Sequence, residues 1–181
     1  MPSSPAAPAR GGMREAEPLA GYRLCIFDAD GTLRRTTVPG QPCPRGPGEW
    51  ELLPGVRERL AALPWQRAGG PYFGLASNQD QIGAGLFSCR MARDLLRELA
   101  FAAIGQTPPD SALQLCPHAL GIACDCRKPG AGMLVRIMAF YGVHRRETVF
   151  VGDSETDRLA AAAAGVDFLE ARELFGRAQP A

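Results

Sequence analysis

The stretch YRLCIFDADGTL, residues 22–33, predicts a strand in its first half and a functional turn in its second. Residues 22–28 are a short, mostly apolar run that stops at a carboxylate, which is typical of a buried strand. Asp28 and Asp30 are one residue apart, and Gly31 allows a sharp turn that can aim both carboxylates into one space. We therefore expect a buried strand whose carboxyl end carries a pair of acids.

The rest of the chain alternates between predicted strands and predicted helices. Apolar runs indicate further strands at 70–78, 112–116, 148–153 and 166–170. Apolar residues at helical spacing indicate helices at 53–65, 86–104 and 154–165, and one more that has Pro129 in its first turn and continues to Tyr141. This alternation predicts an α/β fold, a Rossmann-like parallel sheet with helices on both faces.

The chain of 181 residues is long enough for one domain, which we place at residues 21–178. Residues 1–20 are small, proline-rich and polar, so we interpret them as a disordered leader without a signal peptide. Residues 36–50 are too rich in proline and glycine for a helix or a central strand and predict a short surface flap. No insertion is large enough for a cap domain, and no apolar run is long enough to cross a membrane. We expect a cytoplasmic monomer.

Polar residues end several of the predicted strands. In open parallel sheets, ligands bind beyond the carboxyl ends of the strands, so these side chains should converge there. The converging residues are Asp28 and Asp30, Ser77 and Asn78, and Asp153 with Asp157, joined by Lys128.

Several carboxylates in one place repel one another unless a cation or a proton relieves them. Because only oxygen ligands are offered, Mg²⁺ is the natural cation, and Lys128 is suited to a phosphate. Each piece has a simpler explanation: Asp-x-Asp-Gly can form a turn or a calcium-type loop, GDSETD can cap a helix, and Lys128 can be solvated. The pieces in this order, each at a strand end, favour phosphoryl transfer through an aspartyl-phosphate.

The stretch CPHALGIACDCRKPG, residues 116–130, carries Cys116, His118, Cys124 and Cys126. Three thiolates and one imidazole are a ligand set for structural zinc. A disulfide would leave one of the three cysteines unpaired, and a reactive thiol requires one activated cysteine rather than three. We therefore predict a zinc site that holds the loop and so places Arg127 and Lys128. The other three cysteines, Cys25, Cys43 and Cys89, we interpret as small buried or half-buried hydrophobic residues.

The segments FDADGTL, SNQ, RKP and VGDSETD resemble, in this order, the four motifs of haloacid-dehalogenase-superfamily phosphatases. The resemblance covers residues 22 to 170. It implies a nucleophile, a general acid/base, phosphoryl-binding groups and a magnesium site. The residues implied are Asp28 as nucleophile and Mg²⁺ ligand, Asp30 as general acid/base and as ligand through its carbonyl, Ser77 and Asn78 as phosphoryl-binding residues, Lys128 as a stabilising cation, Asp153 as Mg²⁺ ligand and Asp157 as its support.

The zinc loop is similar to the branch that contains heptose 1,7-bisphosphate phosphatases and histidinol-phosphate phosphatases. The segment NQDQIGAG fits the heptose pattern, except that Ala84 stands where that pattern usually has arginine. The five residues between His118 and Cys124 resemble the histidinol-phosphate type, and Arg127 is the candidate contact for a second phosphate. A small phosphorylated metabolite is therefore the expected substrate, with heptose bisphosphate ahead of histidinol phosphate.

Two other functions remain open. A polynucleotide 3′-phosphatase would use similar motifs, but a net charge of +1 and the lack of an aromatic-basic stripe disfavour nucleic acid. A zinc-loop binding module with inactive catalytic residues conflicts with the intact set of Asp28, Asp30, Lys128 and Asp153.

Overall fold

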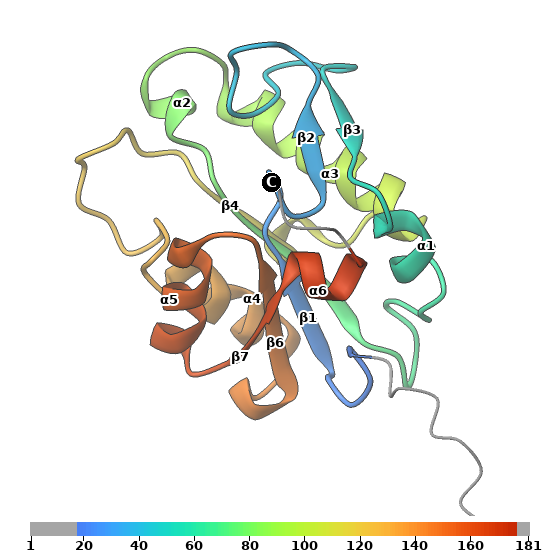
Figure 1. Cartoon of the computed structure of the whole chain (residues 1–181). Coiled ribbons are helices and arrows are strands. Elements are labelled where there is room, and N and C mark those ends of the chain that lie inside the picture. The colour runs from blue at the N-terminus through green and yellow to red at the C-terminus, as the bar shows by residue number, and fades with distance from the viewer. Residues whose placement is uncertain (1–17, 177–181) are drawn as a thin grey trace, which may run out of the picture.

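A five-stranded parallel sheet forms the centre of the molecule, with strand order β5-β4-β1-β6-β7 (Figure 1). The computed structural model describes residues 18–176, so residues 1–17 of the expected leader and the last two residues of the expected domain lie outside the described residues. The strands are β1 (Leu24–Phe27), β4 (Tyr72–Asn78), β5 (Leu113–Cys116), β6 (Thr148–Gly152) and β7 (Asp167–Glu170).

Both faces of the sheet are covered by helices, as predicted. Successive residues of a strand point to opposite faces, so Cys25 and Phe27 lie in one apolar cluster and Leu24 and Ile26 in the other. The first cluster is closed by helices α1 (Val56–Leu60), α3 (Cys89–Ile104) and α6 (Ala171–Phe175), and the second by α4 (Gly132–Tyr141) and α5 (Glu155–Ala164). The sheet is therefore buried on both sides, and its strand ends are left to form a site.

Three of the predicted helices differ from the structure at their ends. The helix expected over 53–65 is only α1, which stops at Leu60; the indole of Trp65 then folds back and donates a 2.6 Å hydrogen bond to the Leu60 carbonyl. The helix expected from 86 begins at Cys89, because the Ser88 side chain caps it by accepting from the Met91 amide. Pro129 lies outside α4, which begins three residues later at Gly132.

The segment 36–50 is an irregular flap, as predicted, but its two ends pair in a way that was not predicted. Strand β2 (Arg34–Thr36) and strand β3 (Trp50–Leu52) form an antiparallel pair at its root. The flap and the loop after β5 both extend beyond the carboxyl ends of the sheet (Figure 1). The described residues hold no cap domain, and no helix among them is long and apolar enough to cross a membrane.

Candidate active site

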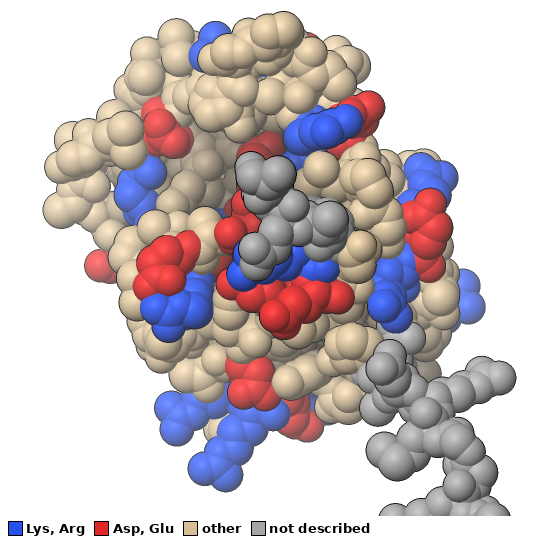
Figure 2. All heavy atoms as spheres, in the orientation of Figure 1, with Lys and Arg blue, Asp and Glu red and all other residues tan. Residues whose placement is uncertain are grey.

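The polar strand ends converge on one small pocket, as the sequence predicted. Asp28 and Asp30 follow β1, Ser77 and Asn78 end β4, and Asp153 follows β6. The pocket has a volume of about 190 Å³ and is lined by Asp28, Asp30, Ser77, Asn78, Lys128, Asp153, Ser154, Thr156 and Asp157. In the space-filling view, acidic and basic side chains gather near the middle of one face of the molecule (Figure 2).

Lys128 lies buried between two carboxylates. Its Nζ is 2.5 Å from Asp28 Oδ1 and 2.6 Å from Asp157 Oδ1, and all three side chains are at most 8% exposed. Burial raises the pKa of Asp28 to about 7, against the lowering effect of the Lys128 ammonium. Burial lowers the pKa of Lys128, but the two carboxylates together raise it above its ordinary value. The cation therefore partly compensates the acids, and a metal cation beside Asp28 would favour its ionised form further.

Asp153 is placed by the turn that follows β1. Thr32 donates a 2.9 Å hydrogen bond to Asp153 Oδ1. Gly31 has a positive φ of 90°, and a Cβ at this position would lie 2.2 Å from Asp153 Oδ2. Glycine at 31 is therefore needed both for the turn and for the close approach of this carboxylate.

Asp157 supports the site from the first turn of α5. Ser154 donates to Asp157 Oδ2 at 2.6 Å through its hydroxyl and at 3.2 Å through its backbone amide. With Oδ1 facing Lys128, both Asp157 oxygens are engaged within the protein. These contacts join Asp157 to Lys128 and Ser154, and its role as a support for Asp153, which the resemblance implies, stays a prediction.

Three carboxylates, those of Asp28, Asp153 and Asp157, offer oxygen atoms within 4.8 Å of one another. Hard divalent cations prefer such oxygen donors, and Mg²⁺ is commonly held by one or two carboxylates. Since Asp157 is engaged by Lys128 and Ser154, Asp28 and Asp153 are the carboxylates best placed to hold the ion directly. The residues present therefore fit a magnesium ion.

Asn78 connects β4 to the loop that carries Lys128. Its amide donates to the Lys128 carbonyl at 3.1 Å and accepts from the Lys128 amide at 3.0 Å. The side chain is thus occupied by the backbone of Lys128, which assigns it a positioning role beside the predicted phosphoryl-binding one. Ser77 lies buried in the pocket, where its hydroxyl oxygen accepts from Gln79 at 2.7 Å.

Sequence reasoning missed two buried partners of Asp30. Arg34 Nε donates to Asp30 Oδ1 at 2.8 Å, and Gln79 Nε2 donates to Asp30 Oδ2 at 2.8 Å. Gln79 directly follows Ser77 and Asn78, which was a signal that it reaches the same strand end. Arg34 carried no such signal: it lies four residues after Asp30, and the turn between them, closed by a 2.8 Å hydrogen bond from the Gly31 amide to the Arg34 carbonyl, brings the two side chains together.

The predicted zinc ligands Cys116, His118, Cys124 and Cys126 form one cluster. Four of the distances between their Sγ and Nδ1 atoms are 3.5, 3.7, 3.3 and 3.6 Å. A tetrahedral zinc with ordinary Zn–S and Zn–N bonds has ligand-to-ligand distances of about 3.5–3.8 Å. All three cysteines are free thiols, and their Sγ separations of 3.6 and 3.7 Å are far longer than a disulfide bond. The cluster fits zinc and does not fit a disulfide.

Arg127 is turned toward this loop rather than into the pocket. Its guanidinium donates to the His118 carbonyl and lies 4.0 Å from Asp80, and the residue is absent from the pocket lining. The contact of Arg127 with a second phosphate stays a prediction. The other three cysteines are buried or half-buried, as predicted.

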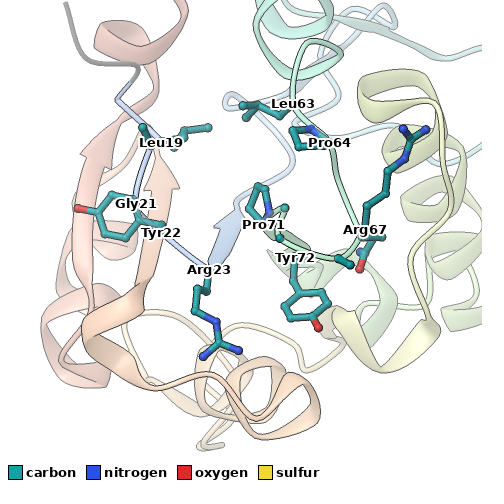
Figure 3. Close-up of a pocket in the computed structure, with 14 residues that line it drawn as sticks. Leu19, Gly21, Tyr22, Arg23, Leu63, Pro64, Arg67, Pro71 and Tyr72 are labelled. Atoms are coloured by element: carbon teal, nitrogen blue, oxygen red, sulfur yellow. The ribbon is translucent and has the colours of Figure 1, made fainter.

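A larger cavity, of about 620 Å³, lies at the opposite edge of the sheet, where β1 and β4 begin (Figure 3). Leu19, Leu63, Pro64 and Pro71 contribute apolar surface to it, and the carboxylates described above do not line it. Cavity volume alone would therefore place the active site at the wrong end of the molecule, whereas the clustered titratable groups identify the smaller pocket as the candidate active site.

Known proteins resemble this chain over most of its length. The HAD-hydrolase-like family matches residues 125–170, which include Lys128, Asp153 and Asp157. A D-glycero-alpha-D-manno-heptose-1,7-bisphosphate 7-phosphatase of Mycobacterium tuberculosis is 34% identical over 155 residues, covering 81% of this chain and 77% of the relative. The D-glycero-beta-D-manno-heptose-1,7-bisphosphate 7-phosphatase of Bordetella bronchiseptica is 32% identical and covers 79% of this chain and 76% of the relative.

Solved structures show the same likeness. The D,D-heptose 1,7-bisphosphate phosphatase of B. bronchiseptica, solved with magnesium and phosphate, superimposes with a TM-score of 0.64 at 33% identity. It covers 81% of this chain and 78% of that chain. A HAD-like protein of Mesorhizobium loti has a TM-score of 0.61 at 22% identity and supports the fold alone, with 80% of this chain and 69% of that one covered. The chain therefore belongs to the haloacid-dehalogenase-like phosphatases, in the family of the heptose-1,7-bisphosphate 7-phosphatases.

Proposed function

We propose that this phosphatase uses Mg²⁺ and an aspartyl-phosphate to remove the 7-phosphate of a heptose 1,7-bisphosphate. The observation that carries the chemistry is the pocket in which Asp28 faces Lys128 at 2.5 Å with Asp153 beside it. The substrate is inferred from the relatives, which are 32–34% identical and named for it.

In the first step, a carboxylate oxygen of Asp28 attacks phosphorus and the ester P–O bond breaks. Asp30 donates a proton to the departing alcohol oxygen, so that an alcohol leaves rather than an alkoxide. The Lys128 ammonium stabilises negative charge on the phosphoryl group as it moves. The product is a phosphoryl group bound to Asp28.

In the second step, water attacks phosphorus and the bond to Asp28 breaks. Asp30, now ionised, takes the proton of that water, and inorganic phosphate and free Asp28 result. Ser77 lies buried at the same pocket, where its hydroxyl can donate to the phosphoryl group because it accepts, rather than donates, in its bond with Gln79.

Asp28, Asp153 and the backbone carbonyl of Asp30 would hold the magnesium ion. When bound, the ion would neutralise charge on the phosphoryl oxygens and keep Asp28 ionised. Asp157 would support the site through Lys128 and Ser154. The four-residue cluster on the neighbouring loop would hold zinc in a structural role, because its four protein ligands leave no position for a substrate.

We also propose that residues 21–178 form the working domain, as a monomer in the cytoplasm. The cytoplasm is supported by the three thiols of the zinc cluster, since reduced thiols persist in reducing compartments.

The test is a comparison of kcat/KM across a substrate panel. It contains the alpha and beta anomers of D-glycero-D-manno-heptose 1,7-bisphosphate, histidinol phosphate and a 3′-phosphorylated oligonucleotide. We expect the highest kcat/KM on one heptose anomer, and no turnover by Asp28→Asn on any substrate. The short zinc loop resembles that of the histidinol-phosphate phosphatases, so a higher kcat/KM on histidinol phosphate than on either heptose anomer would overturn the heptose assignment. Turnover by Asp28→Asn near the wild-type rate would overturn the aspartyl-phosphate.

A further inference from the structure

The Asp30 carboxylate accepts three hydrogen bonds from the side chains of Arg34 and Gln79. Arg34 donates to Asp30 Oδ1 through Nε at 2.8 Å and to Oδ2 through Nη2 at 3.4 Å. Gln79 donates to Oδ2 at 2.8 Å. Both partners are almost fully buried, at 1% and 2% exposure, whereas the Asp30 side chain keeps 18% of its surface exposed at the pocket.

The hydrogen bonds leave one direction open for a proton. A carboxylate offers about four lone pairs, and three donors from Arg34 and Gln79 account for three of them. The free lone pair belongs to Oδ1, since Oδ2 receives two of the three donors. Arg34 and Gln79 therefore restrict the rotation of the carboxyl group and select the oxygen that can exchange a proton.

Arg34 is itself fixed from three sides. Its Nη1 donates to the Leu95 carbonyl of α3 at 3.3 Å, and its guanidinium lies 5.9 Å from the centre of the Trp50 ring in β3. Its carbonyl accepts from the Gly31 amide at 2.8 Å, which ties the turn of the acid pair to the root of the flap. A buried ion pair often adds little net stability, so stability alone is a weak reason to bury this guanidinium.

We propose that Arg34 is a positioning residue for proton transfer by Asp30, an inference that rests on the proposed function. It holds Asp30 so that Oδ1 gives its proton to the alcohol oxygen while the ester P–O bond breaks and the Asp28–phosphorus bond forms. The same Oδ1 then takes a proton from water while water bonds to phosphorus and the bond to Asp28 breaks. Arg34 should therefore matter for substrates whose leaving group must be protonated. These substrates are alkyl phosphates, such as sugar phosphates.

The leaving group separates this role from a general structural one. Nitrophenolate departs without a proton, whereas the alkoxide of a sugar does not. We therefore compare kcat/KM, which reports the steps through the first phosphoryl transfer, on p-nitrophenyl phosphate and on the best alkyl phosphate of the substrate panel. The variants are Arg34→Gln, Arg34→Lys and Gln79→Met. Arg35→Gln is the matched control, since Arg35 is the next residue of β2 and forms an exposed ion pair with Glu51.

For Arg34→Gln we expect kcat/KM on the alkyl phosphate to fall about 10²-fold, which is within the range that general acid catalysis contributes. On p-nitrophenyl phosphate, whose leaving group needs no proton, we expect kcat/KM to fall less than about 10-fold. Arg34→Lys should recover part of the loss, Gln79→Met should show the same dependence on leaving group, and Arg35→Gln should be unchanged. In an Asp30→Asn background, Arg34→Gln should cause no further loss, because it acts through Asp30.

Equal losses on the two substrates would overturn the positioning role, as would a full additional loss in the Asp30→Asn background. Should Arg34→Gln fail to fold, as shown by thermal unfolding, Arg34→Lys decides by the same comparison. The proposed function fails separately: if Asp28→Asn hydrolyses alkyl phosphates like the wild type, it is overturned whatever the Arg34 variants do.

Discussion

At the scale of single residues, the tightest packing in the site is that of Gly31 against Asp153. Alanine at 31 would bring a Cβ within 2.2 Å of Asp153 Oδ2, so we expect Gly31→Ala to push this carboxylate away from its position. The Mg²⁺ concentration for half-maximal activity should rise about 10-fold or more, in line with other losses of ligand support. The measurement is a magnesium titration of phosphatase activity.

The control is Gly142→Ala, at the end of α4. Gly142 also has a positive φ, of 61°, but a Cβ there would meet no atom within 4 Å. Both variants should lose about 1 kcal/mol of folding stability from the left-handed backbone. Only Gly31→Ala should change the magnesium requirement, and equal magnesium curves for the two variants would contradict the proposed position of Asp153 in the metal site.

Lys128 separates two buried carboxylates, so its removal should affect stability as well as activity. In Lys128→Met, Asp28 and Asp157 lose their shared cation, and an unpaired buried charge costs about 3–5 kcal/mol. We expect a lower Tm in Mg²⁺-free buffer and a partial recovery when Mg²⁺ is added, because a bound cation relieves the same carboxylates.

The matched control for this variant is Arg97→Met. Arg97 also contacts two carboxylates, Asp94 and Asp110, each at 2.5 Å, but on the surface, where ion pairs are weak. Its Tm should change little and should not respond to Mg²⁺. A Tm of Lys128→Met that is equally low with and without Mg²⁺ would argue against a metal site beside Lys128.

At the scale of elements, the first turn of α5 connects helix capping with the active site. Ser154 accepts from the Asp157 amide and donates to the Asp157 carboxylate, so one hydroxyl caps the helix and holds a site residue. Ser154→Ala should cost about 1 kcal/mol of stability, the usual loss for an N-cap, and should also lower kcat/KM. Thermal unfolding and steady-state kinetics measure the two effects.

Ser88 provides the comparison, because it caps α3 in the same way by accepting from the Met91 amide, and it does not line the pocket. Ser88→Ala should lose similar stability and keep the wild-type kcat/KM. If both serine variants retained full activity, the support of Asp157 by Ser154 would be unimportant for catalysis.

The loop after β5 is the element that delivers Lys128 to the site. It is held by the Cys/His cluster at one end and by the two hydrogen bonds of Asn78 to the Lys128 backbone at the other. Cys124→Ser should therefore remove zinc, lower kcat and raise KM. A displacement of about 1 Å of a catalytic group can cost on the order of 10²-fold in rate.

Cys89→Ser is the control for that variant, since Cys89 is half-buried at the start of α3 and outside the cluster. It should keep zinc and both kinetic parameters. The positioning role of the cluster would be wrong if Cys124→Ser lost zinc and kept wild-type kcat and KM.

At the scale of the whole molecule, the two proposed metals should behave independently. The zinc cluster has four protein ligands, whereas the carboxylate site would keep water molecules and exchange its ion readily. Mild EDTA treatment should abolish activity, added Mg²⁺ should restore it, and metal analysis should still find about one zinc per chain. Protein purified under reducing conditions without zinc would contradict the assignment of the loop.

The sequence by itself determined the α/β architecture and predicted most of the residues that line the pocket. Short apolar runs that end in Asp28, Asn78 and Asp153 reveal the strands in the sequence. A parallel strand that is buried on both faces needs apolar side chains along its whole length, whereas the loop after it can carry polar residues. The sequence also predicted the zinc cluster between Cys116 and Cys126, because three thiols and an imidazole on one short loop are a typical ligand set for zinc. The ligand roles in both metal sites remain predictions.

Only the tertiary structure decided which partners hold these residues in place. The flap root pairs β2 with β3, and neither strand has an apolar pattern that would reveal the pair. Arg34 is buried where Trp50 of β3 and the Leu95 carbonyl of α3 meet its guanidinium, which in turn holds Asp30. Asn78 meets the Lys128 backbone, and Arg127 turns to the His118 carbonyl, across distances in sequence that local periodicity does not describe. Strand and helix patterns arise from neighbours along the chain, whereas the orientation of a catalytic carboxylate depends on contacts between elements that meet only after folding.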